Sequence, residues 1–211
     1  MKVDSSNALQ ILLLIGGLSI IPALLFTVTG FTRILIVLGF IRNALGLQNT
    51  PPNQVLIGIS LFLTLFVMMP TITAIKKDAY EPLVHHNIST STAITRGTEP
   101  LREFMFRQTS NQDLSLFVNL AKIKTPKTRA QVPTYVLIPA FILSELKTAF
   151  QIGFLIFLPF LLIDLIVSST LMSMGMIMLP PSFISLPFKV LLFVLVDGWD
   201  LVTHSLVASF H

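Results

Sequence analysis

Long apolar stretches set the strongest limit on how this chain of 211 residues folds. Four of them run at about 8–41, 54–75, 136–178 and 186–210. A helix that spans a bilayer needs roughly 20 residues, so the second and fourth stretches each fit one helix. The first and third stretches are too long for one span; as a single helix, the first would reach roughly 50 Å at about 1.5 Å per residue. Only 11% of the residues are charged and mean hydropathy is +0.82, which excludes an ordinary soluble domain. We therefore expect a bilayer, or a protein assembly that replaces one, to surround these stretches.

Helix breakers and charges divide the first and third stretches. They are Gly16, Gly17, Pro22, Gly30 and Arg33 in the first, and Pro139, Glu145, Lys147, Pro159 and Asp164 in the third. Interrupted helices are tolerated where neighbouring protein or a cavity satisfies the freed backbone groups, so we expect these helices to pack against other helices. Gly46 and the pair Pro51–Pro52 predict a tight turn that makes the first two stretches a helical hairpin.

The predicted fold is all-α and has three segments. Residues 1–75 form a hydrophobic helical hairpin, 76–135 a polar segment of amphipathic helices, and 136–211 hydrophobic helices with a methionine-rich loop. The middle segment holds nine Lys and Arg against five Asp and Glu, so it carries the whole net charge of +4. A basic segment between apolar blocks favours lipid headgroups or acidic partners over nucleic acid.

Capping residues divide the middle segment into short helices. Ser89 caps a helix that is predicted to end at Gly97, Thr98 begins the next helix, and Asn111 caps a third. Apolar residues at helical spacing give the second and third helices one apolar face each. They are Leu101, Phe104 and Met105 in the second helix, and Leu114, Phe117, Val118 and Ala121 in the third.

The sequence contains no candidate catalytic constellation. There are no cysteines, which excludes disulfides, thiolate metal sites and cysteine catalysis. Gly-x-Ser-x-Gly, His-Glu-x-x-His and phosphate-binding glycine loops are also missing from the sequence. His85 and His86 are interpreted as a solvated pair in the polar segment. We expect a protein that is not an enzyme and binds neither a cofactor nor a metal.

Several charged residues stand among apolar neighbours and are candidates for structural or functional roles. They are Arg33, Glu145, Lys147, Asp164, Lys189, Asp197 and Asp200. A lone charge at membrane depth costs at least about 2.5–3.5 kcal/mol on insertion scales, so such residues pair or face water. We interpret them as ion pairs that hold helices in register. A proton or ion pathway is one alternative, and charges near helix ends that reach the membrane interface are another. Glu145 and Lys147 are two apart and cannot pair on one helix, whereas Asp164 and Lys189 are predicted to pair.

Four methionines stand at a spacing of two in one short segment: Met172, Met174, Met176 and Met178. A helical core stripe prefers spacings of three and four, so this spacing, with Gly175 and Pro180–Pro181, predicts a bent segment. Methionine is unbranched and deformable, which suits a contact that seals and yields. One such loop per subunit would form a soft ring in a cyclic oligomer; ordinary methionine packing is the alternative.

At residues 139–154 the chain resembles the signature of the FliP family of flagellar export-gate proteins. The matching residues include Pro139, Ala140, Phe141, Ser144, Glu145, Leu146, Phe150, Gln151 and Gly153. The resemblance extends from Leu9 to Phe210, through Phe31–Arg33, Asn43–Gly46, Pro51–Val55, Leu186–Lys189 and Asp197–Trp199. Residues 99–109 and the Asp-Gly-Trp sequence are closer to the flagellar branch than to the related virulence injectisomes.

The resemblance implies a pore subunit in the bacterial inner membrane, in the flagellar basal body. Five copies would join FliQ- and FliR-type subunits, with an FlhB-type subunit, in a helical cone through which unfolded flagellar proteins pass. Met174, Met176, Ile177 and Met178 would form a gasket at the narrowest point; the family usually has three successive methionines, and Ile177 replaces the central one with a stiffer side chain.

The resemblance places the middle segment on the periplasmic side, although Lys and Arg counting would draw it towards the cytoplasm. Two functions from other classes remain as alternatives. A proton-coupled secondary transporter would use Glu145 and Asp164, but it would need symmetry between the two halves, and the sequence has none. A structural scaffold would leave the methionine segment without a role.

Overall fold

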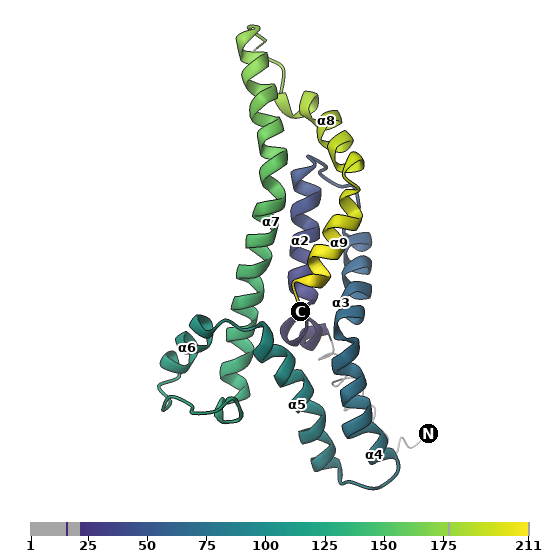
Figure 1. The fold of residues 1–211 in the computed structure, drawn as a ribbon, viewed down its shortest axis with the longest axis vertical. Helices are drawn as coiled ribbons and strands as arrows, with labels where there is room; N and C mark the ends of the chain where they lie inside the picture. The colour runs from purple at the N-terminus through teal and green to yellow at the C-terminus, as the bar shows by residue number, and fades with distance from the viewer. Residues whose placement is uncertain (1–15, 17–21, 177, 211) are drawn as a thin grey trace, which may run out of the picture. The chain divides into compact units, whose positions relative to one another are not determined.

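Helices make up the regular structure of this protein (Figure 1). The computed structural model describes residues 16, 22–176 and 178–210, and within them it contains helices and no strand, so the predicted all-α class is confirmed. The elements are α2 (Phe31–Ala44), α3 (Asn53–Ile75), π-helix η1 (Lys76–Tyr80), α4 (Glu81–Val84), α5 (Thr90–Gln108), α6 (Asn111–Leu120), 3-10 helix η2 (Arg129–Gln131), α7 (Thr134–Ser173), α8 (Pro181–Leu195) and α9 (Gly198–Ala208). A further helix at Pro22–Val28 precedes α2.

The chain divides into two compact units, each built from two separate sequence segments. Unit 1 comprises Met1–Thr29 and Ala74–Ile142, and unit 2 comprises Gly30–Thr73 and Leu143–His211. Two helical segments, Asn53–Val84 and Thr134–Ser173, are long and apolar enough to cross a membrane. Two bent pairs of helices are long and apolar enough to cross a membrane only when each pair is counted as one span. These pairs are Pro22–Val28 with α2, and α8 with α9.

Unit 2 has α2 at its core. This helix buries apolar side chains at helical spacing, among them Phe31, Ile34, Val37, Leu38 and Ile41. It ends at Gly46, which adopts a positive φ of 75°, and Leu47 N–H donates to the Arg42 carbonyl at 3.1 Å. These features form a Schellman cap. Arg42 also donates to the Asn53 side chain at 2.6 Å, which fixes the start of α3 and confirms the predicted turn.

Breaks in the apolar stretches follow the sequence in part. The predicted break at Gly30 is confirmed, because one helix ends at Val28 and α2 begins at Phe31. Of the residues before Pro22, the structure describes only residue 16, so the predicted break at Gly17 lies outside the described residues. The predicted division of the third stretch before Ser173 is wrong, since α7 runs unbroken for 40 residues through Pro139 and Pro159. Each proline removes only one backbone hydrogen bond, and neighbouring helices accommodate such gaps in apolar helices.

The fourth stretch was expected to form one helix, and that expectation is wrong. Helices α8 and α9 meet at an angle of 65°. Asp197 adopts left-handed backbone angles, with φ 50° and ψ 56°, which ends α8 locally. The Phe193 ring occupies the space that a Cβ at Gly198 would need, so the bend requires glycine there. Phe193 also packs edge-to-face on Trp199, with ring centroids 5.3 Å apart.

In unit 1, α5 is the main element of the polar segment. Ser89 caps it as predicted and accepts a hydrogen bond from Thr92 N–H at 3.3 Å. The prediction of a helix end at Gly97 and a new start at Thr98 is wrong, because α5 continues to Gln108. The packing of the whole helix outweighs the weak helix preference of this one glycine. A Cβ at Gly97 would make an ordinary van der Waals contact with the Cβ of Ala79, at 3.5 Å.

Helix α6 begins one residue earlier than predicted. Ser110, rather than Asn111, is its cap. The Ser110 hydroxyl donates to the Asp113 carboxylate at 2.7 Å and accepts from the Asp113 N–H at 3.1 Å, a reciprocal arrangement similar to a capping box. The predicted apolar faces are the less exposed sides of these helices, with Phe104, Met105 and Val118 buried.

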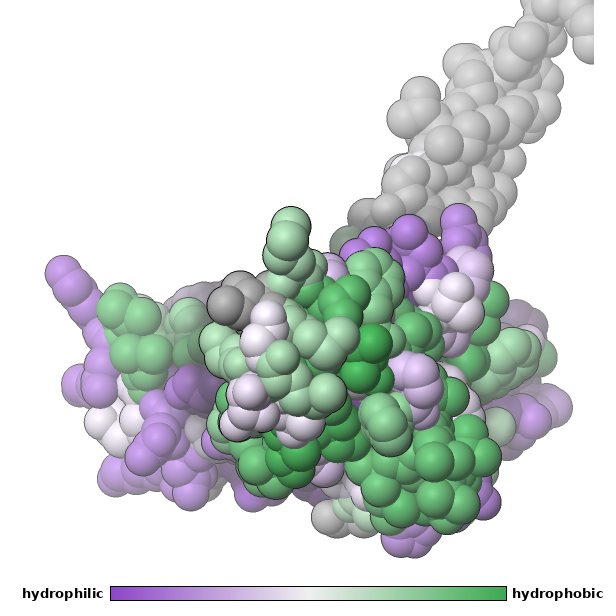
Figure 2. All heavy atoms as spheres, turned by 90° about the horizontal axis from the view of Figure 1, so that it is seen from above, coloured by the Kyte–Doolittle hydropathy of each residue, from purple (hydrophilic) through white to green (hydrophobic). Residues whose placement is uncertain are grey.

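Large apolar side chains remain exposed over much of the surface. Figure 2 shows hydrophobic residues gathered over a broad area, with hydrophilic residues mainly towards its edges. Examples on the two long helices are Phe62, Phe66, Phe150, Phe154, Leu155, Leu162, Leu165 and Ile166. A monomeric soluble protein rarely exposes apolar patches on this scale, so lipid or partner proteins must cover them.

Candidate functional site

The methionine loop, Met172–Met178, follows directly from the way α7 ends. Gly175 adopts a positive φ of 76°, its N–H donates to the Met172 carbonyl at 3.0 Å, and Met176 N–H donates to the Leu171 carbonyl at 3.0 Å. This is a Schellman cap. The chain then passes Pro180 and re-enters a helix at Pro181. The bent segment predicted from the spacing of two is confirmed.

The described side chains of the methionine loop are exposed. Met178 is 97% exposed, and Met172, Met174 and Met176 are also exposed; Ile177 lies outside the described residues. Within the single chain, these four methionines therefore do not pack in the core. The loop presents soft apolar side chains at the junction of α7 and α8, where another molecule can contact them.

A buried ion pair joins three parts of unit 2. Arg33 on α2 binds both carboxylate oxygens of Glu145 on α7, and its Nε donates to Oε2 at 3.0 Å. The two side chains are only 2% and 1% exposed. Arg33 Nη1 also donates to the carbonyl of Ser209 at 2.8 Å and to its hydroxyl at 3.1 Å. The guanidinium lies 4.0 Å from the centre of the Phe210 ring. Arg33 thereby fixes α7 and the end of α9 to α2.

A second ion pair, the α7–α8 clasp, connects α7 to α8. Lys189 Nζ donates to Asp164 Oδ2 at 2.6 Å, and the Ser185 hydroxyl donates to Oδ1 at 2.6 Å. The predicted pairing of Asp164 with Lys189 is confirmed, and it occurs within one chain. Ser185 and Lys189 lie one helical turn apart on one face of α8, and both are buried, whereas the Asp164 side chain is 33% exposed.

Other predicted charges lie at the surface of the chain. Lys147, Asp197 and Asp200 are exposed, so the expectation that Lys147 and Asp197 are buried is wrong for the single chain. Two residues along a helix turn by about 200°, so burial of Glu145 directs Lys147 outwards. Asp197 occupies the bend between α8 and α9. His85 and His86 lie exposed in the turn after α4, as expected.

The signature residues at 139–153 serve mainly to pack α7. Ala140, Phe141, Ser144 and Glu145 are buried, Pro139 and Leu146 are half-buried, and Phe150 and Gln151 are exposed. Phe150 meets Phe40 edge-to-face, with ring centroids 5.3 Å apart. The same Phe40 ring lies where a Cβ of Gly153 would be, with the nearest ring atom at 2.5 Å. Glycine at this position therefore lets the Phe40 ring lie against the backbone of α7.

Sequence reasoning missed several residues of these clusters. Ser209 and Phe210 carried no recognisable signal, because nothing local to the end of α9 indicates a contact with Arg33. Ser185 was detectable, since it precedes Lys189 by four residues and therefore shares its helix face. No group of three or more His, Cys, Asp and Glu suited to a metal occurs among the described residues.

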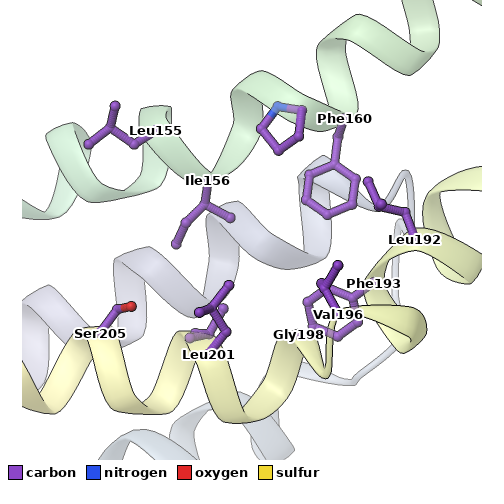
Figure 3. Close-up of a pocket in the computed structure, with 11 residues that line it drawn as sticks. Leu155, Ile156, Phe160, Leu192, Phe193, Val196, Gly198, Leu201 and Ser205 are labelled. Atoms are coloured by element: carbon purple, nitrogen blue, oxygen red, sulfur yellow. The ribbon is translucent and has the colours of Figure 1, made fainter.

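An apolar groove of about 400 Å³ lies between α7 and the bend of α8 and α9 (Figure 3). Its lining is almost entirely aliphatic and aromatic, and Ser205 supplies its only side-chain hydroxyl among the lining residues. Leu155, Ile156 and Phe160 line it from α7, and Leu201 faces them from α9. The groove offers no acid, base or nucleophile pair, so its chemistry suits apolar contact.

Comparisons with known proteins identify the family of this chain. The FliP family model matches residues 14–206. This chain belongs to the FliP family. The flagellar biosynthetic protein FliP of Bacillus subtilis is 55% identical over 205 residues, which cover 97% of this chain and 93% of the relative. Its namesakes in Pectobacterium carotovorum and Treponema pallidum are 55% and 53% identical and are covered over 79% and 76% of their lengths.

Membership of the FliP family supports the flagellar branch over the injectisome alternative, because these relatives are named as flagellar proteins. The family match spans both ion pairs and the methionine loop. It therefore covers all the clusters described above except the contacts of Ser209 and Phe210.

Proposed function

We propose that this chain is a pore-forming subunit of the flagellar type III export gate, which conducts unfolded flagellar proteins across the inner membrane and has no enzymatic activity. The observation that carries the proposal is the methionine loop, a run of exposed apolar side chains held at the end of α7 by a rigid Schellman cap. The family match supports it, since the relatives are named as flagellar biosynthetic proteins.

Assembly with other chains is the second part of the proposal. Five copies surround a central pore together with FliQ- and FliR-type subunits, next to an FlhB-type subunit. The exposed apolar faces support this arrangement: Phe62 and Phe66, one helical turn apart on α3, are 77% and 66% exposed. Such faces are stable only against lipid or other apolar helices. The segment 76–135, which is polar and basic, lies on the periplasmic side of the membrane.

The gate closes, in this proposal, when Met174, Met176, Ile177 and Met178 of each copy meet on the pore axis. Thioether side chains deform easily, so they fill a constriction of changing width and block water and ions. The two ion pairs hold the helices that carry the loop and undergo no chemistry. Asp164 and Glu145 both have cationic partners within the chain, which supports a locking role over proton transport.

Cysteine cross-linking tests the ring arrangement directly, because the chain has no native cysteine. Met176→Cys and Met178→Cys are introduced singly, and membranes are treated with a short bifunctional thiol reagent. We expect covalent multimers of like subunits. Leu120→Cys on α6, where the leucine is 66% exposed, is the control for random collision. Monomers alone, or multimers no more abundant than those of the control, would contradict the proposal.

Membrane conductance tests the gasket. Met176→Gly and Met178→Gly remove the side chains without changing charge, so we expect ions to leak through the closed gate. Met69→Gly serves as a control for the removal of an exposed methionine outside the loop. A secondary transporter predicts instead that the purified chain alone in liposomes takes up a solute, and that outcome would replace the export-gate proposal.

A further inference from the structure

A basic loop, residues 122–129, lies between α6 and α7. It holds four exposed cationic side chains: Lys122, Lys124, Lys127 and Arg129. The sequence has no Asp or Glu between Asp113 and Glu145, and Asp113 is itself buried and bound to the Ser110 hydroxyl. None of the four cations forms an ion pair with another described residue. The basic loop is therefore a surface of uncompensated positive charge.

Lys122 occupies a backbone position that usually belongs to glycine. Helix α6 ends where the Ala121 N–H donates to the Phe117 carbonyl at 3.0 Å, and Lys122 follows with a left-handed φ of 52°. A residue with a Cβ is disfavoured in this conformation, so glycine or asparagine normally follows a helix end of this type. Backbone strain of this kind clusters at functional positions. The lysine thus places a charge where glycine would suit the fold better, which indicates a role for the charge outside folding.

A hollow of about 410 Å³ lies between α6 and the basic loop. Two buried apolar residues, Val118 and Val132, line part of it. Lys127 and Arg129 line it from the loop, and Asn119 lines it from α6. Every other polar lining residue carries a hydroxyl or an amide, and none of the described residues that line the hollow is Asp or Glu. Cations and neutral hydrogen-bond donors without a carboxylate suit the oxygens of a phosphate group.

Contacts within the chain hold the basic loop in place. Arg102 on α5 donates to the Val132 carbonyl at 2.8 Å, and the Lys127 N–H donates to the side-chain oxygen of Gln131 at 2.9 Å. Neither contact involves the Lys127 ammonium or the Arg129 guanidinium. A binding surface whose backbone is already fixed loses less conformational freedom when a ligand binds. The loop therefore presents its cations on a prepared surface.

We propose that the basic loop and the hollow beside it bind the phosphate headgroup of an anionic phospholipid. The equivalent surface of a second copy carries the same four positive charges, and like charges in contact are unfavourable. Assembly of several copies therefore does not bring these loops together, and the molecule that covers this surface in an assembly is an anion.

Two features favour a lipid over a soluble anion. The first is a pair of apolar side chains that flank the loop: Leu120 and Tyr135 are each 66% exposed, and tyrosine is enriched where protein meets the membrane surface. The second is α7, which begins at Thr134, soon after Arg129, and is long and apolar enough to cross a membrane. A polybasic segment next to such a span attracts anionic lipids. The headgroup belongs to the leaflet on the side of segment 76–135, and its binding does not depend on the gasket role.

Native mass spectrometry tests the site on the complex that the full chain forms in its membrane, purified in detergent. The probe is dioctanoyl phosphatidylglycerol, and dioctanoyl phosphatidylcholine, which has no net charge, is the comparison. We expect the complex to bind the anionic lipid more tightly. The variant Lys127→Gln with Arg129→Gln should bind it roughly 25-fold more weakly, because each cation at a membrane surface contributes about fivefold. Arg96→Gln with Arg107→Gln removes two exposed cations of α5 and is the matched control, which should bind as the wild type does.

The same titration separates the lipid from other anions. Equal binding of the two lipids, or an equal loss in the control variant, would overturn the proposal. Displacement of the lipid by an equal concentration of glycerol phosphate would identify a soluble phosphate as the ligand instead. A carbodiimide reagent joins lysine to carboxylate, so coupling of Lys127 to a partner subunit in the complex would identify an acidic protein segment instead. Either result would refute the lipid site.

A variant of Lys122 separates lipid binding from folding. Lys122→Gly relieves the left-handed backbone strain, so the midpoint of thermal unfolding, followed by circular dichroism, should not fall. Binding of dioctanoyl phosphatidylglycerol should weaken about fivefold, because one cation is lost. Lys122→Arg keeps the charge and should keep the binding. Unchanged binding in Lys122→Gly, or a lower unfolding midpoint, would show that the lysine does not serve the lipid site in the proposed way and would count against the proposal.

Discussion

Removal of Glu145 should destabilise unit 2 more than any other single change of a charged side chain described above. The Arg33–Glu145 pair is almost fully buried, with side chains 2% and 1% exposed. Glu145→Ala removes both carboxylate oxygens that the Arg33 guanidinium binds, whereas the contacts of Arg33 with Ser209 and the Phe210 ring remain. Breaking a buried pair by removing one partner typically costs about 3–5 kcal/mol, because the remaining charge stays buried without compensation.

The contacts of the pair support this magnitude. Glu145 accepts two charge-assisted hydrogen bonds from Arg33, and a hydrogen bond to a charged group contributes about 1.5–3 kcal/mol. For 150–250 residues, each kcal/mol shifts the unfolding midpoint by about 2–4 °C. We therefore expect Glu145→Ala to lower the midpoint by roughly 6–20 °C.

The assay uses the single tryptophan of the chain. Trp199 packs on Phe193 within unit 2, so its fluorescence reports unfolding of that unit in detergent. The double variant Arg33→Met with Glu145→Leu replaces both charges by apolar side chains and should recover most of the loss, because no buried charge remains. A midpoint unchanged by Glu145→Ala, or a double variant less stable than both single variants, would refute the reasoning.

Four further changes test other parts of the fold with the same fluorescence assay. Asp164→Asn should cost less than Glu145→Ala, about 1–3 kcal/mol, since Asp164 is one-third exposed and water replaces part of its contact with Lys189; an equal or larger loss would contradict this. Gly198→Ala should lower the stability by about 1–3 kcal/mol, because the new Cβ overpacks against a phenylalanine ring. Gly39→Ala is its control and should raise the stability by about 0.5–1 kcal/mol, because no atom lies within 4 Å of the new Cβ. Gly175→Ala should cost about 1–2 kcal/mol, because its φ of 76° is left-handed; no change would mean that the cap of α7 is not specified by glycine.

The isolation of charged residues among apolar neighbours predicted one ion pair, but it did not identify the partner of Glu145 in the other. Asp164 and Lys189 are the isolated opposite charges of neighbouring apolar stretches, so their pairing followed from the cost of burying either alone. Glu145 called for a partner from another helix by the same argument. The sequence did not identify Arg33, because the two residues are 112 positions apart and only the folded arrangement of α2 and α7 brings them together.

Local signals for helix ends were less reliable than signals for pairing. Gly97 and Pro159 predicted breaks, yet α5 and α7 pass through them, because packing along a whole helix outweighs one weak residue or one missing hydrogen bond. The real bend at Asp197–Gly198 was missed because the apolar composition continues across it. An Asp-Gly dipeptide is a recognised turn signal. At this position it indicates the bend correctly, whereas the continuous hydropathy indicates a single helix.

The position of the methionine loop follows from the clasp formed by Asp164 and Lys189. The clasp joins α7 to α8 at two points that lie 25 residues apart along the chain, and the loop forms the tip of the hairpin between them (Figure 1). At about 1.5 Å per residue, each helix extends only roughly 12 Å beyond the clasp before it reaches the loop. A helix over so short a distance moves as a rigid rod, so displacement of the loop requires bending of α7 or α8, or opening of the clasp. The partly exposed carboxylate of Asp164 makes opening of the clasp less costly than opening of the buried Arg33–Glu145 pair. Movement of the loop is therefore expected to begin at the α7–α8 clasp, while Arg33 and Glu145 hold the rest of unit 2 in place.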